Sequence, residues 1–325
     1  MNENLNFEFV EELFEEKEFN RLVSFSKNLG ESYTPGIHFK TDSFPQMFGE
    51  YKLIRLLGHG KICTAYLAQH VDSHEQFVLR KIAPNHVKQV GDFEFARQFE
   101  KFRHETGGVR AVDASNVATV YDMGTVDEVY FYATRFVQGK NLAKFANANF
   151  LSNRQAAITV KSIAEATHRL HQAGIFHCNL KTANVILSEG EQRPWLLEPE
   201  SALLRSFASN DAEAAAFQAP EVLNDLNNID AVAEVWSLGA ILYNCLLGEP
   251  LAISGPVGSP RKRNPKIAKD LETICLKCLR KDRSQRYVNA AELASDLELF
   301  LDYQPIKASP VGFMAKLMNR VSRRG

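Results

Sequence analysis

The chain has 325 residues, of which 45% are hydrophobic and 24% are charged, and its formal net charge is −1. This composition is typical of a folded, water-soluble protein with a large core, and the near-neutral charge argues against bulk electrostatic binding of nucleic acid. The five cysteines are an odd number scattered along the chain, which fits the reducing cytoplasm better than a disulfide framework.

The sequence shows neither a membrane span nor a signal peptide. Its amino terminus is acidic, and its longest apolar stretch, residues 235–247, contains Ser237 and Asn244 and is too short to cross a bilayer. We therefore predict a buried helix there and no transmembrane helix. Cys275 and Cys278 lie in another helical pattern without a second pair at zinc-ligand spacing, so we predict that they are buried core thiols.

Residues 1–47 are predicted to form an extension that precedes the main domain. In a glutamate-rich context, apolar residues recur at helical spacing at Phe7, Val10, Leu13 and Phe14. This pattern predicts either a surface helix packed on the main domain or a helix that docks on a partner. Proline and glycine residues between positions 34 and 45 then indicate an irregular linker.

A run of predicted strands begins at Tyr51. Residues 51–57, 64–68 and 77–82 have the pattern of strands. The first two are joined by Gly58-His59-Gly60, a turn of the kind that brings backbone amides over phosphates, because glycine allows close approach and positive φ.

The elements that follow are a helix, two strands and a second long helix. The patterns predict a helix over residues 93–109, strands over 115–121 and 129–137, and a helix over 158–170. A polar loop at residues 177–184 then separates the second helix from an apolar strand at 185–187. A loop between rigid elements is where a fold can hold reactive side chains in place.

This loop reads HCNLKTAN and resembles the catalytic loop of protein kinases, H-R-D-L-K-x-x-N. The matching residues are His177, Leu180, Lys181 and Asn184. Cys178 replaces the arginine, and Asn179 replaces the aspartate that accepts the proton of the substrate hydroxyl. Because an amide has no carboxylate to accept a proton, the resemblance suggests a protein-kinase fold with a defect in its chemistry.

The resemblance implies a small lobe over residues 48–137 that holds a nucleotide. Its implied nucleotide-binding residues are Gly58, Gly60, Ala65, Val78, Arg80, the gatekeeper Thr134 and the hinge residues Arg135 and Val137. Arg80 falls where the family has its phosphate-gripping lysine, although a shift by one residue would give that role to Lys81. Glu105 falls at the position of the lysine's partner, and Cys63 occupies the third glycine position of the turn.

The resemblance also assigns residues of a large lobe over 138–302. Glu198 falls at the metal-holding aspartate of the D-F-G triplet, and Asn184 is the second implied metal ligand. Glutamate has one methylene more than aspartate, which shifts the carboxylate of Glu198 in a site that needs near-octahedral geometry. Pro199 and Glu200 lack the aromatic ring and the backbone freedom of that triplet. Ala214 replaces a threonine of the substrate-side loop. The implied structural residues are His177, Glu221 of the A-P-E element, Glu234 at the start of the central helix, and Arg286, the partner of Glu221.

Residues 270–311 resemble the carboxyl end of a group of bacterial eukaryotic-like Ser/Thr kinases. We place the end of the domain at residue 302, and a basic amphipathic tail at 303–325. The apolar residues of the tail are Phe313, Met314, Leu317, Met318 and Val321, and its basic residues include Lys316, Arg320, Arg323 and Arg324. This pattern predicts a helix packed on the large lobe or, as an alternative, a contact with a membrane surface or a partner.

We therefore predict an α+β, two-lobed protein-kinase-like fold, with a small, mainly antiparallel β lobe and a large, mainly α lobe. Because several parts of the machinery are altered together, the leading functional prediction is a pseudokinase, a regulatory or scaffolding module with a protein partner and no required cofactor. Two alternatives stay open: a weak Ser/Thr phosphotransferase that uses ATP and magnesium, and a nucleotide-binding switch without transfer. No nucleic-acid partner is expected.

The altered site also suggests a hypothesis about its ion pairs. Arginine pairs bidentately with carboxylates, so we predict that Arg80 locks to Glu105 and that Glu198 takes Lys181. Such pairs would neutralise the site without a nucleotide and hold the lobes closed. An unchanged melting temperature in a Glu105→Ala variant would contradict this hypothesis.

Overall fold

The structure is a computed structural model that describes residues 44–59, 62–110, 116–148, 151–197, 212–225, 228–253 and 255–309. The chain divides into two units after Ser43, and all described residues belong to the second unit. Several predictions fall outside the described residues, namely those for the amino-terminal extension, for Gly60, for Glu198, Pro199 and Glu200, and for the tail from residue 310 onward.

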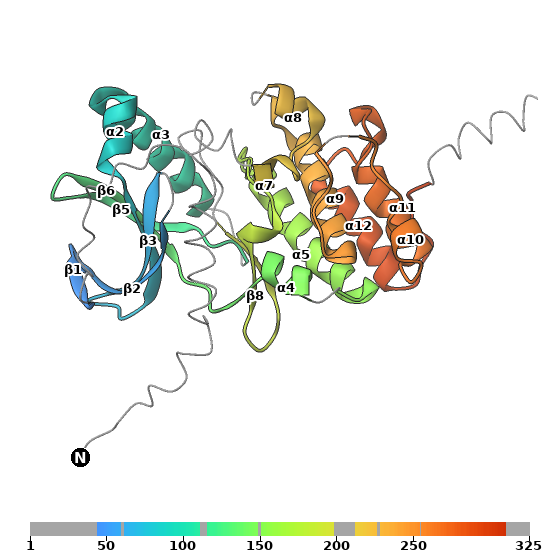
Figure 1. The fold of residues 1–325 in the computed structure, drawn as a ribbon, viewed down its shortest axis with the longest axis horizontal. Coiled ribbons are helices and arrows are strands. Elements are labelled where there is room, and N and C mark those ends of the chain that lie inside the picture. The colour runs from blue at the N-terminus through green and yellow to red at the C-terminus, as the bar shows by residue number, and fades with distance from the viewer. Residues whose placement is uncertain are drawn as a thin grey trace, which may run out of the picture. The chain divides into compact units, whose positions relative to one another are not determined.

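The first part of the described fold is a six-stranded sheet with the strand order β1-β2-β3-β4-β6-β5, in which neighbouring strands are antiparallel (Figure 1). The strands are β1 Gln46–Phe48, β2 Tyr51–His59, β3 Cys63–His70, β4 Gln76–Ile82, β5 Val120–Val126 and β6 Val129–Arg135. Two helices follow β4, namely α2 Pro84–Val90 and α3 Asp92–Arg110. The start of α2 suits Pro84, since proline has the φ of a helix and no amide hydrogen to leave unpaired in the first turn.

Strand β4 separates the apolar residues on the two faces of this sheet. Because successive side chains of a strand point to opposite faces, Leu79 belongs to one buried cluster and Ile82 to another. The cluster around Ile82 includes Phe95, Phe99 and Phe102 of α3. Arg80 therefore shares a face with Ile82 and α3. Lys81 lies on the other face, where its Nζ is 4.5 Å from the ring centroid of Phe48.

The strand predicted over residues 115–121 has the wrong bounds. The strand in this region is β5, which begins only at Val120. The residues before it pair elsewhere: Val117 forms a parallel bridge with Leu196, and the backbone N–H of Ala118 donates to the carbonyl of Leu196 at 2.8 Å. The apolar pattern predicts extended chain, but Val117 and Ala118 bond to Leu196, which lies outside the six-stranded sheet.

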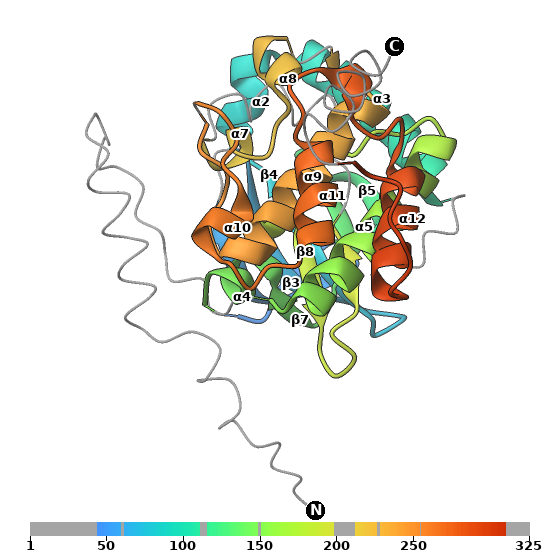
Figure 2. The same ribbon diagram turned by 90° about the vertical axis from the view of Figure 1, so that its right-hand side faces the viewer.

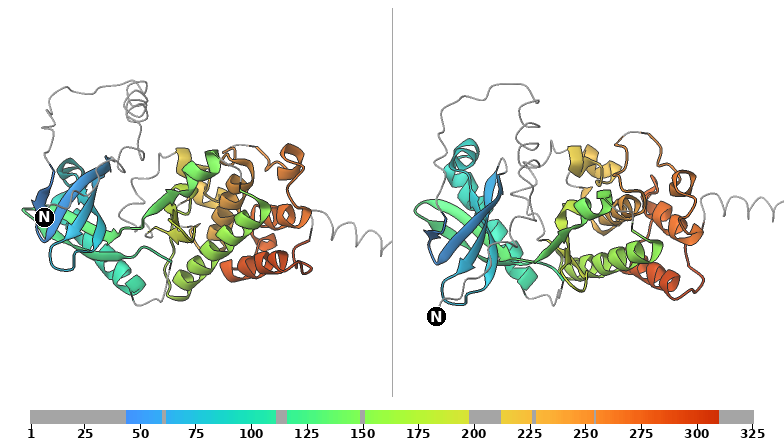
Figure 3. Two further views of the ribbon diagram at one scale, coloured as in Figure 1. Left: turned by 90° about the horizontal axis from the view of Figure 1, so that it is seen from below. Right: turned by 60° about the horizontal axis from the view of Figure 1, so that its bottom comes forward.

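The second part of the described fold is mainly helical. Its helices are α4 Leu142–Ala148, α5 Asn153–Gln172, α7 Ala212–Ala215, α8 Pro220–Asn224, α9 Ala231–Leu247, α10 Pro260–Arg263, α11 Lys269–Cys278 and α12 Ala290–Leu301, with 3₁₀ turns η3 Thr182–Asn184 and η5 Arg283–Gln285. A small antiparallel sheet has the order β7-β8-β9, from β7 Gly139–Asn141, β8 Val185–Ser188 and β9 Pro194–Leu196. In both views of Figure 3, the green α5 and the red α12 run side by side.

The two central helices begin at capping residues. Ser152 and Gln155 form a capping box at the start of α5, in which each side chain accepts a hydrogen bond from the backbone of the other residue. At the start of α9, Asp230 Oδ1 accepts from the N–H of Ala233 at 2.8 Å. Helix α9 ends at Gly248, whose φ of +74° is a left-handed conformation that glycine adopts without strain.

The predicted buried helix is confirmed as α9. All residues from Ala233 to Leu247 are buried, as expected for a helix that is apolar on every side, and in Figure 2 α9 lies among α5, α11 and α12. Cys275 and Cys278 are buried in the same core, and burial raises the pKa of the Cys278 thiol, so they are core thiols as predicted. Within the described ranges, no helix is long and apolar enough to cross a membrane.

The described fold extends beyond both predicted ends of the domain, 48 and 302. At the start, β1 pairs with β2 over residues 46–48. At the end, the chain folds back after α12, and the buried carboxylate of Asp296 accepts hydrogen bonds from the N–H groups of Lys307 and Ala308 at 2.6 and 2.9 Å. A buried carboxylate is costly unless it is hydrogen-bonded, so this contact fixes a segment that sequence analysis assigned to the tail.

Replacing Gly239 of α9 with alanine is expected to destabilise the fold. A Cβ at this position would lie 2.4 Å from Cys278 Cβ and 3.2 Å from Leu279 Cγ, so α9 and α11 would have to separate. Overpacking of this kind lowers the free energy of unfolding by about 1–3 kcal/mol, which urea unfolding measures.

The matched control is Gly107→Ala in α3, where no atom lies within 4 Å of an added Cβ. Since alanine is favoured over glycine inside a helix by about 0.5–1 kcal/mol, this variant should be as stable as the unmodified protein or more stable. If both glycine variants unfold at the same urea concentration, the tight packing of α9 on α11 is contradicted.

Candidate functional site

The loop between α5 and β8 has a backbone held by its own polar side chains. His177 is fully buried, and its Nε2 donates to the carbonyl of Leu197 at 2.8 Å. Its Nδ1 accepts from the N–H of Asn179 at 3.3 Å. The side-chain amide of Asn184, at the end of η3, donates to the carbonyl of Asn179 at 2.8 Å. These contacts close the loop on itself and bring three of the predicted site residues together.

Helix α9 supports the same loop through Glu234. Its Oε1 accepts from the N–H of Cys178 at 2.6 Å, and its Oε2 accepts from His171 Nε2 at 2.6 Å. Cys178 has a φ of +69°, a conformation that is uncommon for residues other than glycine, asparagine and aspartate and that persists only where its surroundings enforce it. The buried carboxylate of Glu234 is therefore a structural support for the loop.

The predicted reactive residues of the loop are Asn179 and Lys181. Both side chains are about nine-tenths buried. Asn179 lies at the point where the loop would present a proton acceptor, and its amide has no such group. Lys181 provides a cationic amine in the same loop. The arrangement can orient a hydroxyl or bind negative charge, but it contains no general base at residue 179.

The predicted nucleotide-binding residues of the sheet occupy neighbouring positions on three strands. Ala65 of β3 pairs with Arg80 of β4, and Val78 of β4 pairs with Thr134 of β6. Arg80 Nη1 donates to Thr134 Oγ1 at 3.1 Å, and its guanidinium carbon lies 5.4 Å from the ring centroid of Tyr132. The structure thus brings Arg80 and the buried Thr134 together on the face that carries α3.

The other predicted nucleotide-binding residues are Gly58, Arg135 and Val137, together with Gly60, which lies outside the described residues. Gly58 belongs to β2, and no atom lies within 4 Å of an added Cβ there. Strand β6 ends at Arg135, before its predicted end at residue 137, and the Arg135 guanidinium lies 5.8 Å from the ring centroid of Trp195. Val137 follows in the connection to β7.

Two predicted ion pairs stay predictions. The side chain of Glu105 and the whole of Glu198 lie outside the described residues, so the structure tests neither the Arg80–Glu105 pair nor the Glu198–Lys181 pair. The metal-binding role assigned to Asn184 and Glu198 stays a prediction for the same reason. In the part of the chain that the structure describes, no group of three or more histidine, cysteine, aspartate or glutamate residues could hold a metal ion.

The segment predicted to lie on the substrate side contains the short helix α7, which is rich in alanine. Ala214 lies buried in α7, and its carbonyl accepts from the N–H of Phe217 at 3.0 Å. Ala219 is also buried and precedes α8, which begins at Pro220. At position 214 the segment therefore has no hydroxyl that could contact the loop at residues 177–184.

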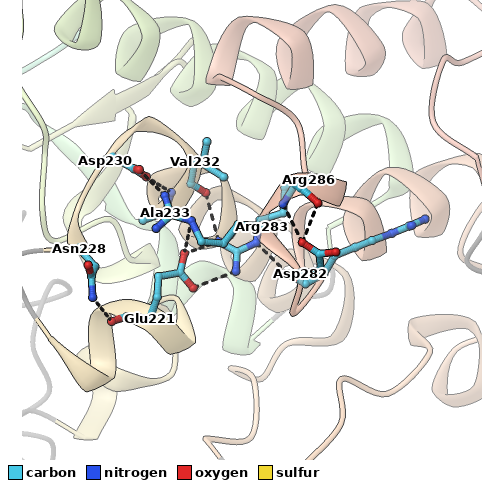
Figure 4. Close-up of polar contacts among 10 residues, drawn as sticks. Glu221, Asn228, Asp230, Val232, Ala233, Asp282, Arg283 and Arg286 are labelled. Atoms are coloured by element: carbon cyan, nitrogen blue, oxygen red, sulfur yellow. Dashed lines mark hydrogen bonds and ion pairs between the residues drawn. The ribbon is translucent and has the colours of Figure 1, made fainter.

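The predicted partner of Glu221 is present in the structure as a two-point ion pair (Figure 4). Arg286 Nη1 and Nη2 donate to the two carboxylate oxygens of Glu221 at 2.6 and 2.9 Å. Arg286 also donates to the carbonyl of Arg280 at 2.8 Å and lies 4.9 Å from the ring centroid of Trp236. This pair joins α8 to the turn before α12.

Arg283 is a second cation in this network that sequence analysis did not identify. Its Nε lies 3.6 Å from Glu221 Oε1, and its Nη2 pairs with Asp230, the residue that caps α9. In Figure 4, Arg283 and Arg286 extend from the turn around η5 toward Asp230 and Glu221. Burial is the largest single influence and raises the pKa of the Glu221 carboxyl, but the hydrogen bonds from Arg286 and the backbone, together with the charges of Arg286 and Arg283, outweigh it, and the pKa lies below its usual value.

The stability that Glu221 provides is expected to fall in acid. A glutamate in the unfolded chain has a pKa of about 4.3, and the folded-state pKa is lower, so its contribution is complete above that value and is lost as the pH falls through the folded pKa. Urea unfolding of the unmodified protein and a Glu221→Gln variant, between about pH 7 and pH 3, should show a gap that narrows below about pH 4.3. A gap that is independent of pH would contradict the role of the charge.

Asn116 joins the residues before β5 to α5 and β9, and sequence analysis missed it. Its Nδ2 donates to Ser162 Oγ at 3.0 Å and to the carbonyl of Pro194 at 3.3 Å, and its Oδ1 accepts from Arg169 Nη2 at 2.8 Å. In the sequence it is one asparagine before an apolar run, without a motif around it.

Comparison with known proteins places these features in a family context. A family model described as protein kinase domain matches residues 51–297. The serine/threonine-protein kinase PrkC of Bacillus subtilis is 23% identical over 271 residues, which are 78% of this chain and 41% of that protein. PknB of Mycobacterium leprae is 26% identical over 292 residues, which are 82% of this chain and 45% of that protein. The chain thus spans less than half the length of these relatives.

Solved structures show the same fold. The kinase domain of PknI from Mycobacterium tuberculosis has a TM-score of 0.63 and 22% identity, covering 78% of this chain and 97% of that domain. The apo form of PpkA-294 has a TM-score of 0.64 and 16% identity, covering 77% of this chain and 97% of that one. The predicted two-lobed α+β fold is therefore confirmed.

Proposed function

Because the chain belongs to the protein kinase family, among relatives of the bacterial Ser/Thr kinases, we propose that it is a pseudokinase that acts as a regulatory or scaffolding module. A pseudokinase keeps the fold of a kinase and uses it for binding. In this proposal the protein transfers phosphate very slowly or not at all, requires no cofactor and acts through a protein partner.

The observation that carries the proposal is Asn179 in an otherwise ordered loop. The supports from Asn184 and Glu234 give the loop a defined backbone, yet the residue at its reactive position cannot take a proton. Loss of a general base lowers a rate by about 10²–10⁴. The defect therefore concerns the chemistry of one side chain, while the shape of the loop is kept.

The position of Arg80 gives further support. Arginine and lysine are not interchangeable around phosphates, because a guanidinium is a planar fork and an ammonium is a compact point charge. The Arg80 guanidinium is committed to Thr134 Oγ1 and lies against the ring of Tyr132. A nucleotide that used Arg80 as its phosphate grip would have to draw the guanidinium away from these contacts.

One observation favours a second candidate, a weak Ser/Thr phosphotransferase that uses ATP and magnesium. Lys181 and Asn184 are retained, and Asn184 has its side chain fixed in the loop. Phosphoryl transfer depends mainly on positioning and charge stabilisation, so a loop with these two residues can sustain slow transfer without a strong base. A nucleotide-binding switch without transfer is the third candidate.

The test is transfer of the γ-phosphate of ATP to the protein itself and to a generic protein acceptor, with calorimetric titration of ATP in the presence and absence of magnesium. We expect no transfer by the unmodified protein and no more than weak binding. An Asn179→Asp variant restores the acceptor and is the gain-of-function arm.

Three outcomes separate the candidates. Transfer by the unmodified protein that disappears in a Lys181→Ala variant would contradict the pseudokinase proposal and favour the weak enzyme. Nucleotide binding that raises the melting temperature without transfer would favour the switch. Absence of both nucleotide binding and phosphate transfer would support a binding module. In that case the Asn179→Asp variant should have the same melting temperature as the unmodified protein.

A further inference from the structure

Strands β3, β4 and β6 place predicted nucleotide-binding residues in neighbouring rows on one face of the sheet. In the first row, Arg80 pairs with Ala65 on one side and with Tyr132 on the other. In the next row, Val78 pairs with Thr134. Residues two apart along a strand share a face, so both rows point the same way. Arg80 and Thr134 are therefore diagonal neighbours, which a long side chain can connect.

The side chain of Arg80 connects the two rows. Its Nη1 donates to Thr134 Oγ1 at 3.1 Å, and its guanidinium carbon lies 5.4 Å from the ring centroid of Tyr132. Because Thr134 lies opposite Val78, the guanidinium reaches from its own row into the row that Val78 and Thr134 share. A cation thus lies among the apolar residues that the resemblance assigns to nucleotide binding.

The acceptor of this hydrogen bond is buried. Only 1% of the surface of Thr134 is exposed, and a buried hydroxyl is costly unless it has a hydrogen-bond partner. A hydrogen bond from a charged group is strong enough that its loss changes an equilibrium by about tenfold to a hundredfold. The contact of the guanidinium with the ring of Tyr132 adds to this attraction. A ligand that takes the place of the guanidinium has to replace both contacts.

The residue type at position 80 decides how this face is used. An ammonium is a compact, strongly hydrated charge on a flexible stem, whereas a guanidinium is a planar fork that lies flat on aromatic rings and bonds at the same time. Arg80 makes both kinds of contact with residues of β6. A nucleoside that lies against Val78 and Thr134 therefore competes with the guanidinium for the same row.

We propose that the guanidinium of Arg80, held on Thr134 and Tyr132, occupies the position of a nucleoside and keeps one from binding. The inference rests on the proposed function, because it explains how a kinase fold serves as a binding module without a nucleotide. A site that is open in only a fraction of the molecules binds its ligand more weakly by that fraction. The strength of a charged hydrogen bond corresponds to an open fraction of about 1–10%.

The test is calorimetric titration of the full chain with adenosine, which contains the base and the sugar but no phosphate. Its binding depends neither on a phosphate grip nor on magnesium, so it reports on the face of the sheet alone. We expect no binding by the unmodified protein at millimolar adenosine. An Arg80→Ala variant removes the guanidinium and should bind adenosine at least about tenfold more tightly.

A Thr134→Val variant tests the same contact from the other side. It removes the hydroxyl that holds Arg80 Nη1 and keeps a branched side chain of similar size. Adenosine should bind this variant more tightly than the unmodified protein, but less tightly than Arg80→Ala, because the ring of Tyr132 still attracts the guanidinium. The melting temperature without ligand shows whether each variant is folded. If Arg80→Ala does not fold, the Thr134→Val variant decides the question.

The matched control is Lys81→Ala, which removes a cation from the next position of β4. The Nζ of Lys81 lies on the other face of the sheet, 4.5 Å from the ring centroid of Phe48 and 5.7 Å from that of Tyr66. This variant should therefore bind adenosine no better than the unmodified protein.

Three results would overturn the inference. They are a gain in Lys81→Ala equal to that in Arg80→Ala, adenosine binding by the unmodified protein as tight as by Arg80→Ala, and no gain in either folded variant of the Arg80–Thr134 contact. None of them involves transfer of phosphate. The proposed function would fail by a different result, namely transfer from ATP by the unmodified protein, so the two failures are distinguishable.

Discussion

An Arg286→Met variant is expected to lose about 3–5 kcal/mol of its free energy of unfolding, because removing one partner of a buried ion pair leaves the other charge uncompensated. The Arg286 side chain has 0% of its surface exposed, and Glu221 has only 15%. The same guanidinium also holds the carbonyl of Arg280 and lies over Trp236. Urea unfolding at neutral pH measures the loss as a lower midpoint.

Arg283 provides the control for this prediction. It approaches the same carboxylate, but its side chain is 37% exposed and its contact with Glu221 is 3.6 Å long. Exposed ion pairs contribute about 0–1 kcal/mol, so Arg283→Met should have a small effect. The double variant Glu221→Gln/Arg286→Met should lose less than the sum of its single variants, since the two residues act on one interaction. A loss below about 1 kcal/mol in Arg286→Met would contradict the buried pair.

A Glu234→Ala variant is expected to lose about 2–4 kcal/mol and to loosen the loop at residues 177–184. The substitution would leave the N–H of Cys178 and the Nε2 of His171 without their acceptor. It would also remove the contact that holds Cys178 at a φ of +69°, a conformation that costs about 1–3 kcal/mol where nothing enforces it. Hydrogen exchange of the loop amides, measured together with urea unfolding, separates local loosening from global destabilisation.

Two further variants sharpen this test. Glu234→Gln keeps an oxygen acceptor and should have a smaller effect than alanine. Glu165→Ala removes a glutamate of α5 that pairs with Lys161 at the surface, and its cost should be below about 1 kcal/mol. Unchanged protection of the Cys178 amide in the Glu234→Ala variant would show that the loop keeps its shape without this carboxylate.

One contact between residues with a fixed position in a motif was predicted from the sequence and is present in the structure. It is the pairing of Arg286 with Glu221, which was predictable because each residue has a recognisable neighbourhood in the chain. The buried helix α9 was predictable for a different reason: its continuous apolar pattern leaves no side for water.

Contacts without a motif could not be predicted. Asn116 reaches Ser162, Arg169 and Pro194, and nothing in the residues around it shows that these distant segments meet. The start of β5 was placed too early for the same reason, since the alternation of side chains identifies extended chain but not the strand it pairs with. Equally, cysteine is not a residue type that indicates a positive φ, so the conformation of Cys178 was not visible in the sequence.

The supports of the loop have a consequence for how this protein can change over generations. Glu234 and Asn184 hold the backbone N–H of Cys178 and the backbone carbonyl of Asn179, and any amino acid except proline provides both groups. The side chain at residue 179 can therefore be replaced at little cost to the support from Asn184, whereas residue 178 must also adopt a φ of +69°, which disfavours β-branched and bulky residues. Selection for folded protein therefore acts on Glu234 more strongly than on the side chain of residue 179. The shape of the loop is thus independent of whether the protein transfers phosphate.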